Sequence, residues 1–307
     1  RTYFVTKIPP RGLREALEDL QPALRIIRSG RFTDVISTGS AIAVPFLVAA
    51  RMLGVRAHFI ESAARADGPS LSGRIVARVP GVRLYTQYPE WSSPAWAYRG
   101  SVLDTFELST TPRTVRPVAR AVVTLGTMRG YPFTRAVRAA ATVLAEVGTP
   151  DREVLWQVGD VDPALVPGRA HVMVPAADLH AAIADADLVI AHAGAGSAIR
   201  ILESGRSPVL LHRRRRHREH VDDHQMMIAT ELARRDLAVT RDPDRLTAAD
   251  ARAAMERLVV TTHATVPFEL TTGRVGRLRP ADIPLARPVR PPGAGPDPVG
   301  GATARSA

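Results

Sequence analysis

A turn of small residues between an apolar run and an amphipathic run is the clearest chemical feature of the sequence. Residues 187–199 read DLVIAHAGAGSAI. The apolar run predicts a strand over Leu188–Ala191, and the helix after the turn is predicted to begin near Ser197. Small side chains let backbone N–H groups approach a ligand closely, and a helix N-terminus adds unpaired donors and a partial positive charge. Such a turn suits a pyrophosphate, which would contact His192, Gly194, Ala195, Gly196 and Ser197.

This turn also has an ordinary structural interpretation. The imidazole of His192 could donate a further hydrogen bond to a phosphate oxygen. A strand-to-helix turn with Ser197 as its N-cap would have the same sequence pattern without any ligand. The turn alone therefore leaves both interpretations open.

A second dense group of polar residues precedes an apolar helical run. Residues 217–225 read HREHVDDHQ and follow four consecutive arginines at 213–216. Hydrogen-bonding groups gathered where a loop enters a helix could hold sugar hydroxyls. Two alternatives remain, because Asp222 or Asp223 could simply cap the helix and the His/Asp pairs could ligate a metal. The residues predicted to meet a sugar are Glu219, Asp223 and Gln225.

Two further strand ends carry residues of interest. The strand of VVTLGTMRG ends at Gly126 and Thr127, which would form a tight turn facing the same ligand. In the N-terminal half, Glu61 follows an apolar run at a strand end and precedes a polar loop. A carboxylate at that position is a candidate general base, and equally a candidate loop anchor.

Short apolar runs alternate with longer amphipathic stretches, which predicts an α/β protein with parallel sheets. In the N-terminal half, strands are expected at Tyr3–Thr6, Asp34–Thr38, Arg56–Ile60 and Arg83–Gln87, and helices at Leu13–Arg28, Ala41–Leu53 and Ser70–Arg78. In the C-terminal half, strands are expected at Ala121–Leu125, Glu153–Val158, His171–Val174, Leu188–Ala191 and Pro208–Leu211. The corresponding helices are expected at Phe133–Val147, Leu179–Asp185, Ser197–Ser204, Asp222–Arg235 and Ala248–Leu258.

This alternation of apolar and amphipathic stretches is interrupted at residues 109–117, STTPRTVRP, where prolines and threonines replace the apolar periodicity. We therefore expect an N-terminal domain over 1–112, a linker over 113–118 and a C-terminal domain over 119–262. From about Pro280 the chain is rich in Pro, Gly and Ala, which predicts a disordered tail over 280–307. Two successive α/β domains are expected to hold a ligand between them, at the carboxyl ends of their strands.

Composition narrows the function classes. The 307 residues carry a net charge of +11, and Lys7 is the single lysine. The charge reflects either a GC-rich genome, which encodes Arg in place of Lys, or attraction to an anionic partner such as a phosphate-bearing ligand, an acidic membrane surface or nucleic acid. Cysteine is absent, which excludes disulfides and thiolate chemistry, and no apolar run approaches the ~20 residues that span a bilayer. The chain begins without methionine, directly in a strand-like run, so we expect its true N-terminus to be missing.

In order, the segments VTLGT, WQVG, ADLVIAHAGAGS and EHVDDHQ resemble the donor-binding domain of glycosyltransferase family 28. The N-terminal segments DVISTGSAIAVPF, FIESAAR, PSLSGR and TQYPEW resemble the acceptor-side, membrane-associating subunit of split enzymes in this family. Such pairs extend dolichol-linked GlcNAc in eukaryotes or build bacterial capsule and exopolysaccharide. Here the two halves are fused in one chain, and the resemblance covers roughly residues 1–240.

This resemblance implies a GT-B fold, which is two Rossmann-like domains facing a cleft. It implies an inverting transfer from a UDP-sugar to a lipid-linked sugar, with no cofactor or metal, by an enzyme peripheral on the cytoplasmic face of the membrane. By position, Gly126 and Thr127 would line the cleft, and the backbone of Val174, Pro175 and Ala176 would meet the uracil. Residues 192–197 would hold the pyrophosphate, and the donor sugar and ribose would meet Glu219, Asp223 and Gln225.

The sequence departs from the family at three points. The glycine-rich N-terminal loop with its histidine is absent, so Glu61 is only a candidate base. Arg200 stands where many relatives have a carboxylate that grips the ribose, with Glu203 one turn further on. The membrane-spanning anchor of the eukaryotic subunit is not visible.

Other functions stay open at this point. A UDP-GlcNAc 2-epimerase would share the fold and donor site but would need acid and base carboxylates facing the sugar. A donor-binding subunit active only with another chain is a non-enzyme alternative. Nucleic-acid binding is disfavoured because the arginines are scattered and no recognition motif is present.

Overall fold

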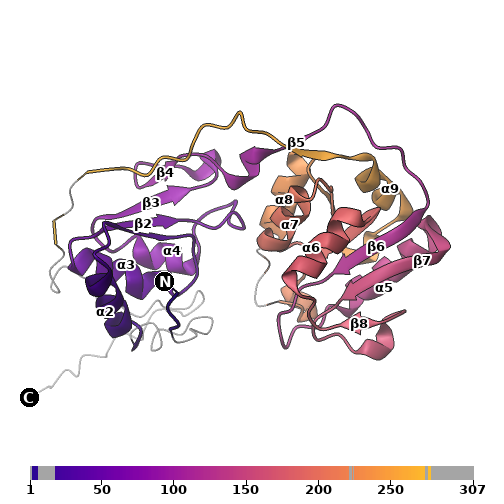
Figure 1. Cartoon of the computed structure of the whole chain (residues 1–307), viewed down its shortest axis with the longest axis horizontal. Coiled ribbons are helices and arrows are strands. Elements are labelled where there is room, and N and C mark those ends of the chain that lie inside the picture. Colours follow the sequence, from indigo (N-terminus) through magenta and orange to yellow (C-terminus); the bar gives the residue numbers. More distant parts are fainter. Residues whose placement is uncertain (1, 6–17, 221–222, 224, 274–275, 278–307) are drawn as a thin grey trace, which may run out of the picture.

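The computed structural model describes residues 2–5, 18–220, 223, 225–273 and 276–277, and these form two lobes that lie side by side (Figure 1). Each lobe is built on a parallel sheet packed against helices. The α/β class with parallel sheets is therefore confirmed. Within the described residues the 3₁₀ helices are η1 (Pro89–Trp91), η2 (Val102–Thr105), η3 (Pro163–Leu165), η4 (Arg215–His217) and η5 (Pro243–Arg245).

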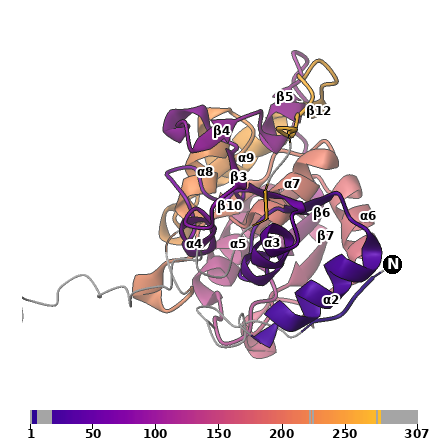
Figure 2. The same ribbon diagram turned by 90° about the vertical axis from the view of Figure 1, so that its left-hand side faces the viewer.

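The N-terminal lobe has one sheet whose strands follow each other in chain order, all in parallel. Its strands are β1 (Asp34–Ser37), β2 (Arg56–Ile60), β3 (Val82–Thr86) and β4 (Trp96–Tyr98), and its helices are α2 (Leu20–Gly30), α3 (Ala43–Met52) and α4 (Leu71–Val76). The helices lie on one side of this sheet (Figures 1 and 2). Ile27, Leu47, Phe59 and Leu84 form the core between helices and sheet.

The C-terminal lobe is larger and has the strand order β11-β10-β9-β6-β7-β8. These strands are β6 (Val118–Thr124), β7 (Gly148–Gln157), β8 (Ala170–His171), β9 (Leu188–His192), β10 (Val209–Leu211) and β11 (Val239–Arg241). The helices are α5 (Thr134–Val147), α6 (Ala176–Asp185), α7 (Ala195–Glu203), α8 (Gln225–Arg234) and α9 (Ala248–Glu256). The chain order reverses on the two sides of β6, so β6 and β9 are adjacent and a crevice opens at their carboxyl ends.

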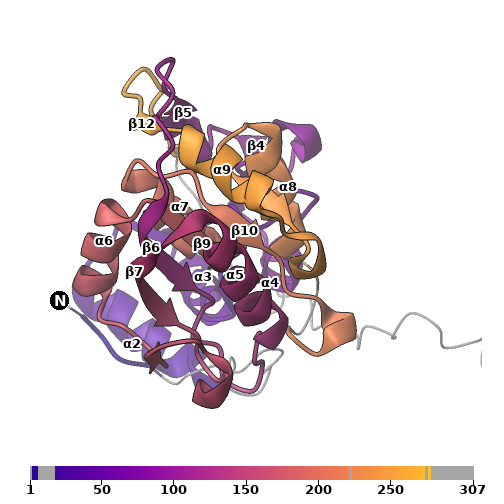
Figure 3. The same cartoon turned by 90° about the vertical axis from the view of Figure 1, so that its right-hand side faces the viewer.

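Both faces of this sheet are buried, because successive side chains of a strand point to opposite faces. Val123 and Ile190 pack with α5 and α9, which lie in front of the sheet in Figure 3. Val122 and Val189 pack with α6, α7 and α8 on the other face. Burial on both sides explains why these strands read as continuous apolar runs in the sequence.

Two connections join the lobes. Strand β5 (Phe106–Leu108) pairs antiparallel with β12 (Val259–Thr261), although residues 109–258 lie between them in the sequence. After β12 the chain returns over the N-terminal lobe, seen as the orange segment in Figure 1. There the backbone N–H of Thr271 donates to the Tyr85 hydroxyl at 2.8 Å, and Phe268 packs edge-on against the Tyr85 ring.

A salt bridge adds to this joint. Arg235, at the end of α8, donates to Asp104 of η2 with 2.7 Å between Nη1 and Oδ1. The side chain of Asp104 also accepts from Tyr98 and from the backbone N–H of Ser101. Helix η2 therefore contacts the C-terminal lobe through a carboxylate that is already oriented by its own loop.

The expected elements agree with the structure except at short or unpaired strands. The strand expected at His171–Val174 is confirmed only at His171, because β8 spans Ala170–His171 and residues 172–174 form no strand. The strand expected at Tyr3–Thr6 is wrong for Tyr3, Phe4 and Val5, which form no strand, and Thr6 lies outside the described residues. The helix expected at Leu13–Arg28 is described only from Glu18, and the tail expected at 280–307 lies outside the described residues. Residues 109–117 contain neither helix nor strand. The short strands β4, β5, β11 and β12 were not predicted.

Candidate functional site

A cavity of about 380 Å³ opens at the carboxyl ends of β6, β7 and β9. One wall is the beginning of α7, and another is the beginning of α6. The lining residues are Thr124, Gln157, Val174, Ala176, Leu179, Ile183, His192, Gly194, Gly196, Ser197 and Arg200. Its position at the reversal of strand order is the usual ligand site of an open parallel sheet.

The cavity brings together residues from two of the predicted segments. Six of the residues predicted to bind the donor line it, namely Val174, Ala176, His192, Gly194, Gly196 and Ser197. Pro175 is the N-cap residue of α6, and Ala195 is the first residue of α7. Their role in binding stays a prediction, but their convergence on one cavity is observed.

The histidine of the turn fits because glycines stand on both sides of it. A Cβ atom at Gly194 would lie 2.4 Å from His192 Nε2, and a Cβ at Gly126 would lie 3.1 Å from the same ring. Gly126 also has φ of +84°, a conformation that other residues adopt with strain. Gly126 thus contributes to the site by giving room to His192, while Thr127 follows it as an exposed residue.

The ring of His192 is neutral at physiological pH. Burial lowers its pKa to about 4, and the nearby positive charge of Arg213 acts in the same direction. Its Nδ1 lies 3.4 Å from the carbonyl oxygen of Thr124, which can only accept. The neutral ring therefore keeps its proton on Nδ1, and Nε2 carries the lone pair on the Gly194 side.

The backbone of α7 supplies donors to the same cavity. Gly194 is the N-cap residue of α7 and has an extended conformation. The N–H groups of the first helical turn have no partner within the helix, and the helix dipole makes this end electropositive. Ser197, on that first turn, adds a hydroxyl to the cavity wall.

A buried glutamine fixes the other end of the cavity. Gln157, at the end of β7, donates from Nε2 to the hydroxyl of Thr124 at 2.8 Å. Its Oε1 accepts from the backbone N–H of Val174 at 2.8 Å. One side chain thus ties the end of β6 to the loop that begins α6. Four lining residues were not predicted from the sequence, namely Thr124, Gln157, Leu179 and Ile183, although Gln157 lies in the WQVG motif.

The polar segment before α8 serves mainly to join loops of this lobe. Glu219 is buried, and its carboxylate accepts from Arg135 at 2.8 and 3.0 Å and from the backbone N–H of Arg214 at 3.0 Å. Gln225 is buried at the start of α8 and accepts from the backbone N–H of Arg213 at 3.2 Å. Asp223 is exposed and accepts from the backbone N–H of Arg215 at 2.9 Å. None of the three lines the cavity, and Asp222 and His224 lie outside the described residues.

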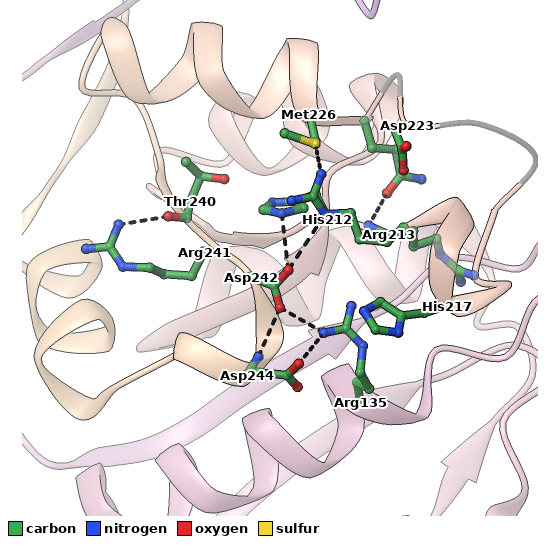
Figure 4. A network of polar contacts seen from close by, with 12 residues as sticks. Arg135, His212, Arg213, His217, Asp223, Met226, Thr240, Arg241, Asp242 and Asp244 are labelled. Carbon is green, nitrogen blue, oxygen red and sulfur yellow. Dashed lines mark hydrogen bonds and ion pairs between the residues drawn. The ribbon is translucent and has the colours of Figure 1, made fainter.

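Arg135 also contacts two further carboxylates next to this segment (Figure 4). Its Nη1 lies 2.8 Å from Asp242 and 2.8 Å from Asp244, on the loop that follows β11. His212 and Arg214 each lie 3.7 Å from the remaining oxygen of Asp242. This network fastens the polar segment to α5 and β11, on the side of the sheet away from α6.

Glu61 has the environment of a loop anchor. It is 1% exposed, and its carboxylate accepts from the backbone N–H groups of Ser62 and Ser70 and from the Ser70 hydroxyl, at 2.8 to 2.9 Å. Ser70 is in turn the N-cap of α4. The carboxylate therefore holds the beginning of α4 against the end of β2.

Comparison with known proteins identifies the larger lobe. Residues 120–266, just under half of the chain, match the family described as the glycosyltransferase family 28 C-terminal domain. The C-terminal lobe is a glycosyltransferase family 28 C-terminal domain. The cavity, all of whose lining residues fall within 120–266, belongs to this family 28 domain. No curated protein matched the chain by sequence.

Solved structures extend the similarity to both lobes. MurG of Acinetobacter baumannii is 18% identical, with 80% of this chain and 72% of that chain covered and a TM-score of 0.51. The glycosyltransferase SnogD from Streptomyces nogalater is 18% identical, with 81% and 74% covered and a TM-score of 0.50. At these identities the likeness concerns the fold, which is GT-B as predicted. With its family 28 domain the chain is a glycosyltransferase, and the family implies a nucleotide-sugar donor.

Among the described helices, none has both the length and the apolar character needed to cross a bilayer. The described residues also contain no group of three or more histidine or acidic side chains placed to hold a metal ion.

Proposed function

We propose that this protein is an inverting glycosyltransferase that moves a sugar from a UDP-sugar to a lipid-linked acceptor at the cytoplasmic face of the membrane. The observation that carries the proposal is the cavity at the start of α7. It combines an electropositive helix end, a glycine-flanked turn and an apolar recess within one volume of about 380 Å³. A nucleoside diphosphate needs an electropositive helix end and a closely approachable turn for its phosphates, and an apolar recess for its base.

The proposed donor pose follows from the lining. Leu179, Ile183 and Val174 form an apolar recess that accepts the flat faces of a pyrimidine. Gln157 holds the Val174 loop in place, so that backbone groups near Pro175 and Ala176 meet the edge of the base. The diphosphate then lies over residues 194–197, where backbone N–H groups point at it.

Charge development supports the direction of transfer. When the sugar leaves, negative charge accumulates on the departing diphosphate, and fixed dipoles stabilise it without reorganisation. The α7 N-terminus provides such a dipole, and the buried guanidinium of Arg213 lies behind the turn, close enough to affect His192. Both raise the stability of the charged leaving group in this pose.

The acceptor part of the proposal rests on other observations. The N-terminal motifs resemble the acceptor-side subunit of split transferases that act on lipid-linked sugars. A chain with net charge +11 is attracted to an anionic membrane surface, which supports peripheral membrane contact. Glu61 and residues outside the described ranges are the candidates for the base that activates the acceptor.

The test is transfer of label from a panel of radiolabelled UDP-sugars into lipid extracts of membranes mixed with the full chain. One UDP-sugar is expected to give lipid-extractable label. Gly196→Val is expected to abolish it, because Gly196 lines the cavity and a Cβ there meets no protein atom within 4 Å. Ala181→Val, on the exposed face of α6, is the matched control and should transfer normally.

Two outcomes would contradict the proposal. Absence of label with every UDP-sugar would argue against transfer to a lipid. Conversion of UDP-GlcNAc without any acceptor would indicate the 2-epimerase reaction instead, and Gly196→Val would abolish that reaction too.

A further inference from the structure

The cavity wall carries one cation on the same face of α7 as the phosphate-binding turn. Arg200 lies three residues after Ser197 and four after Gly196, spacings that place side chains on one side of a helix. All three line the cavity. With His192 neutral, Arg200 is the one charged side chain among the described residues of the lining.

The guanidinium of Arg200 is not engaged by the protein. Within the described part of the chain its guanidinium has no ion pair or hydrogen bond, and the hydrogen bond that the Ser204 hydroxyl donates to this residue goes to its backbone carbonyl. A guanidinium carries five N–H donors and no acceptor, and it binds phosphate oxygens in a planar, two-bond geometry. It is therefore available for an anion in the cavity.

A ribose presents different chemistry. Nucleotide sites that select ribose usually receive its 2′-hydroxyl with an aspartate or glutamate, which accepts the hydroxyl proton. Arg200 can only donate hydrogen bonds. The negatively charged diphosphate is a stronger acceptor for its N–H groups than the neutral 2′-hydroxyl. Of the other polar side chains of the lining, Thr124 and Gln157 are bonded to each other at 2.8 Å, and His192 and Ser197 belong to the turn and the first helical turn that would receive the diphosphate.

The recess proposed to hold the base also does not distinguish uracil from thymine. Val174, Leu179 and Ile183 present methyl groups toward the volume in which a pyrimidine would lie. An added methyl on the base would meet apolar surface and lose no hydrogen bond. Thymine is therefore as acceptable to this recess as uracil.

We propose that Arg200 makes this cavity recognise the charge of the diphosphate and leaves the 2′-hydroxyl unrecognised, so that 2′-deoxynucleoside diphosphates, thymidine diphosphate included, bind about as tightly as UDP. This inference rests on the proposed function, because it describes selectivity within the same donor site. It widens the class of donor from UDP-sugars to pyrimidine nucleoside diphosphate sugars.

The experiment is calorimetric titration of the full chain with UDP, dUDP, dTDP and UMP. UDP and dUDP differ only in the 2′-hydroxyl, and we expect their affinities to agree within about threefold. We expect dTDP to bind at least as tightly as dUDP. UMP, with one phosphate fewer, is expected to bind at least tenfold more weakly than UDP.

Variants of Arg200 separate charge from structure. Arg200→Met should weaken UDP about tenfold or more, narrow the difference between UDP and UMP, and leave the ratio of UDP to dUDP unchanged. Arg200→Glu should weaken all diphosphates further and create a preference for UDP over dUDP of about tenfold, because it supplies the missing acceptor. Arg252→Glu, an equal charge reversal on an exposed position of α9, is the control and should bind like wild type.

The outcomes distinguish this inference from the proposed function. Wild-type binding of UDP more than tenfold tighter than dUDP would overturn the inference and leave the proposed donor site intact. Unchanged UDP affinity in Arg200→Met would overturn the role of Arg200. Failure of all four nucleotides to bind would overturn both.

Discussion

Arg213 donates from Nη2 to the carbonyl oxygen of Leu125 at 2.6 Å, which ties the loop after β10 to the turn at Gly126. The same guanidinium donates to the carbonyls of Glu219, at 2.9 Å, and of Tyr131. It also lies over the ring of Phe133, 4.9 Å from its centre. Burial lowers the pKa of Arg213 to about 10, so the group is charged at neutral pH while it is only 2% exposed.

We predict that Arg213→Met destabilises the chain by about 3 kcal/mol or more, because three carbonyls lose their donor and each buried orphan costs about 1–3 kcal/mol. Arg213→Lys should lose roughly half as much, since an ammonium group can still satisfy some of these carbonyls. The free energy of unfolding from urea titration measures both. Arg252→Met, on an exposed helix face, should stay within about 0.5 kcal/mol of wild type. An unchanged urea midpoint for Arg213→Met would show that the guanidinium does not hold these loops.

This contact also shows what the sequence could not predict. Strand β9 was expected within a residue because buried parallel strands leave continuous apolar runs, here LVIA at residues 188–191. The His192–Ser197 turn was predicted because its residues are contiguous and its chemistry is local. The partners of Arg213 lie up to 88 residues away, and no local pattern records them.

Glu219 illustrates the same limit. Its predicted role was contact with the donor sugar, since it lies in a dense polar segment. Its partner Arg135 is 84 residues distant, on a helix whose register the sequence did not reveal. The strands β4, β5, β11 and β12 escaped prediction for a different reason, because three residues are too few to show a periodicity.

Gly194 and Gly196 should respond differently to added side chains. Gly194→Val places its Cβ 2.4 Å from His192 Nε2, so the ring or the turn must move and both stability and UDP affinity should fall. Gly196→Val meets open space and should change the free energy of unfolding by no more than about 1 kcal/mol while reducing UDP affinity at least tenfold. Chemical denaturation and calorimetry on the same preparations provide the comparison. Normal UDP binding by Gly196→Val would move the diphosphate away from the start of α7.

The neutral form of His192 gives stability a defined pH dependence. The pKa of His192 is about 4 in the folded chain, against 6.5 for an unperturbed histidine. Between these pH values the unfolded chain binds a proton that the folded chain does not. The contribution of His192 to the free energy of unfolding is therefore fully present above about pH 6.5 and is lost as the pH falls toward 4. The contribution is up to about 3 kcal/mol. His192→Gln should flatten this part of the stability profile, whereas His180→Gln, at an exposed position on α6, should retain it.

Donor binding should reverse that preference for the neutral ring. A diphosphate beside Nε2 favours the imidazolium, because the charged ring can then donate to it. A UDP-sugar has no phosphate that titrates near neutrality, so its affinity should rise as pH falls from 7.5 to 5.5. Titration calorimetry in two buffers of different ionisation enthalpy should detect proton uptake in wild type and none in His192→Gln. Proton uptake that persists in the variant would assign it to another group.

Measuring both the unfolding free energy and the transfer rate of a Glu61 variant distinguishes a loop anchor from a general base. The carboxylate already accepts three hydrogen bonds at the start of α4. In Glu61→Gln one carboxylate oxygen becomes an NH₂ group, so at least one of those donors loses its acceptor and faces another donor. We expect a loss of about 1–3 kcal/mol in unfolding free energy, unchanged UDP affinity and less than a tenfold fall in transfer rate. Ser70→Ala removes one of the same hydrogen bonds without touching the carboxylate, and it should reproduce part of the stability loss. A general base would behave oppositely, because Glu61→Gln would then keep its stability while transfer fell by about 10²–10⁴.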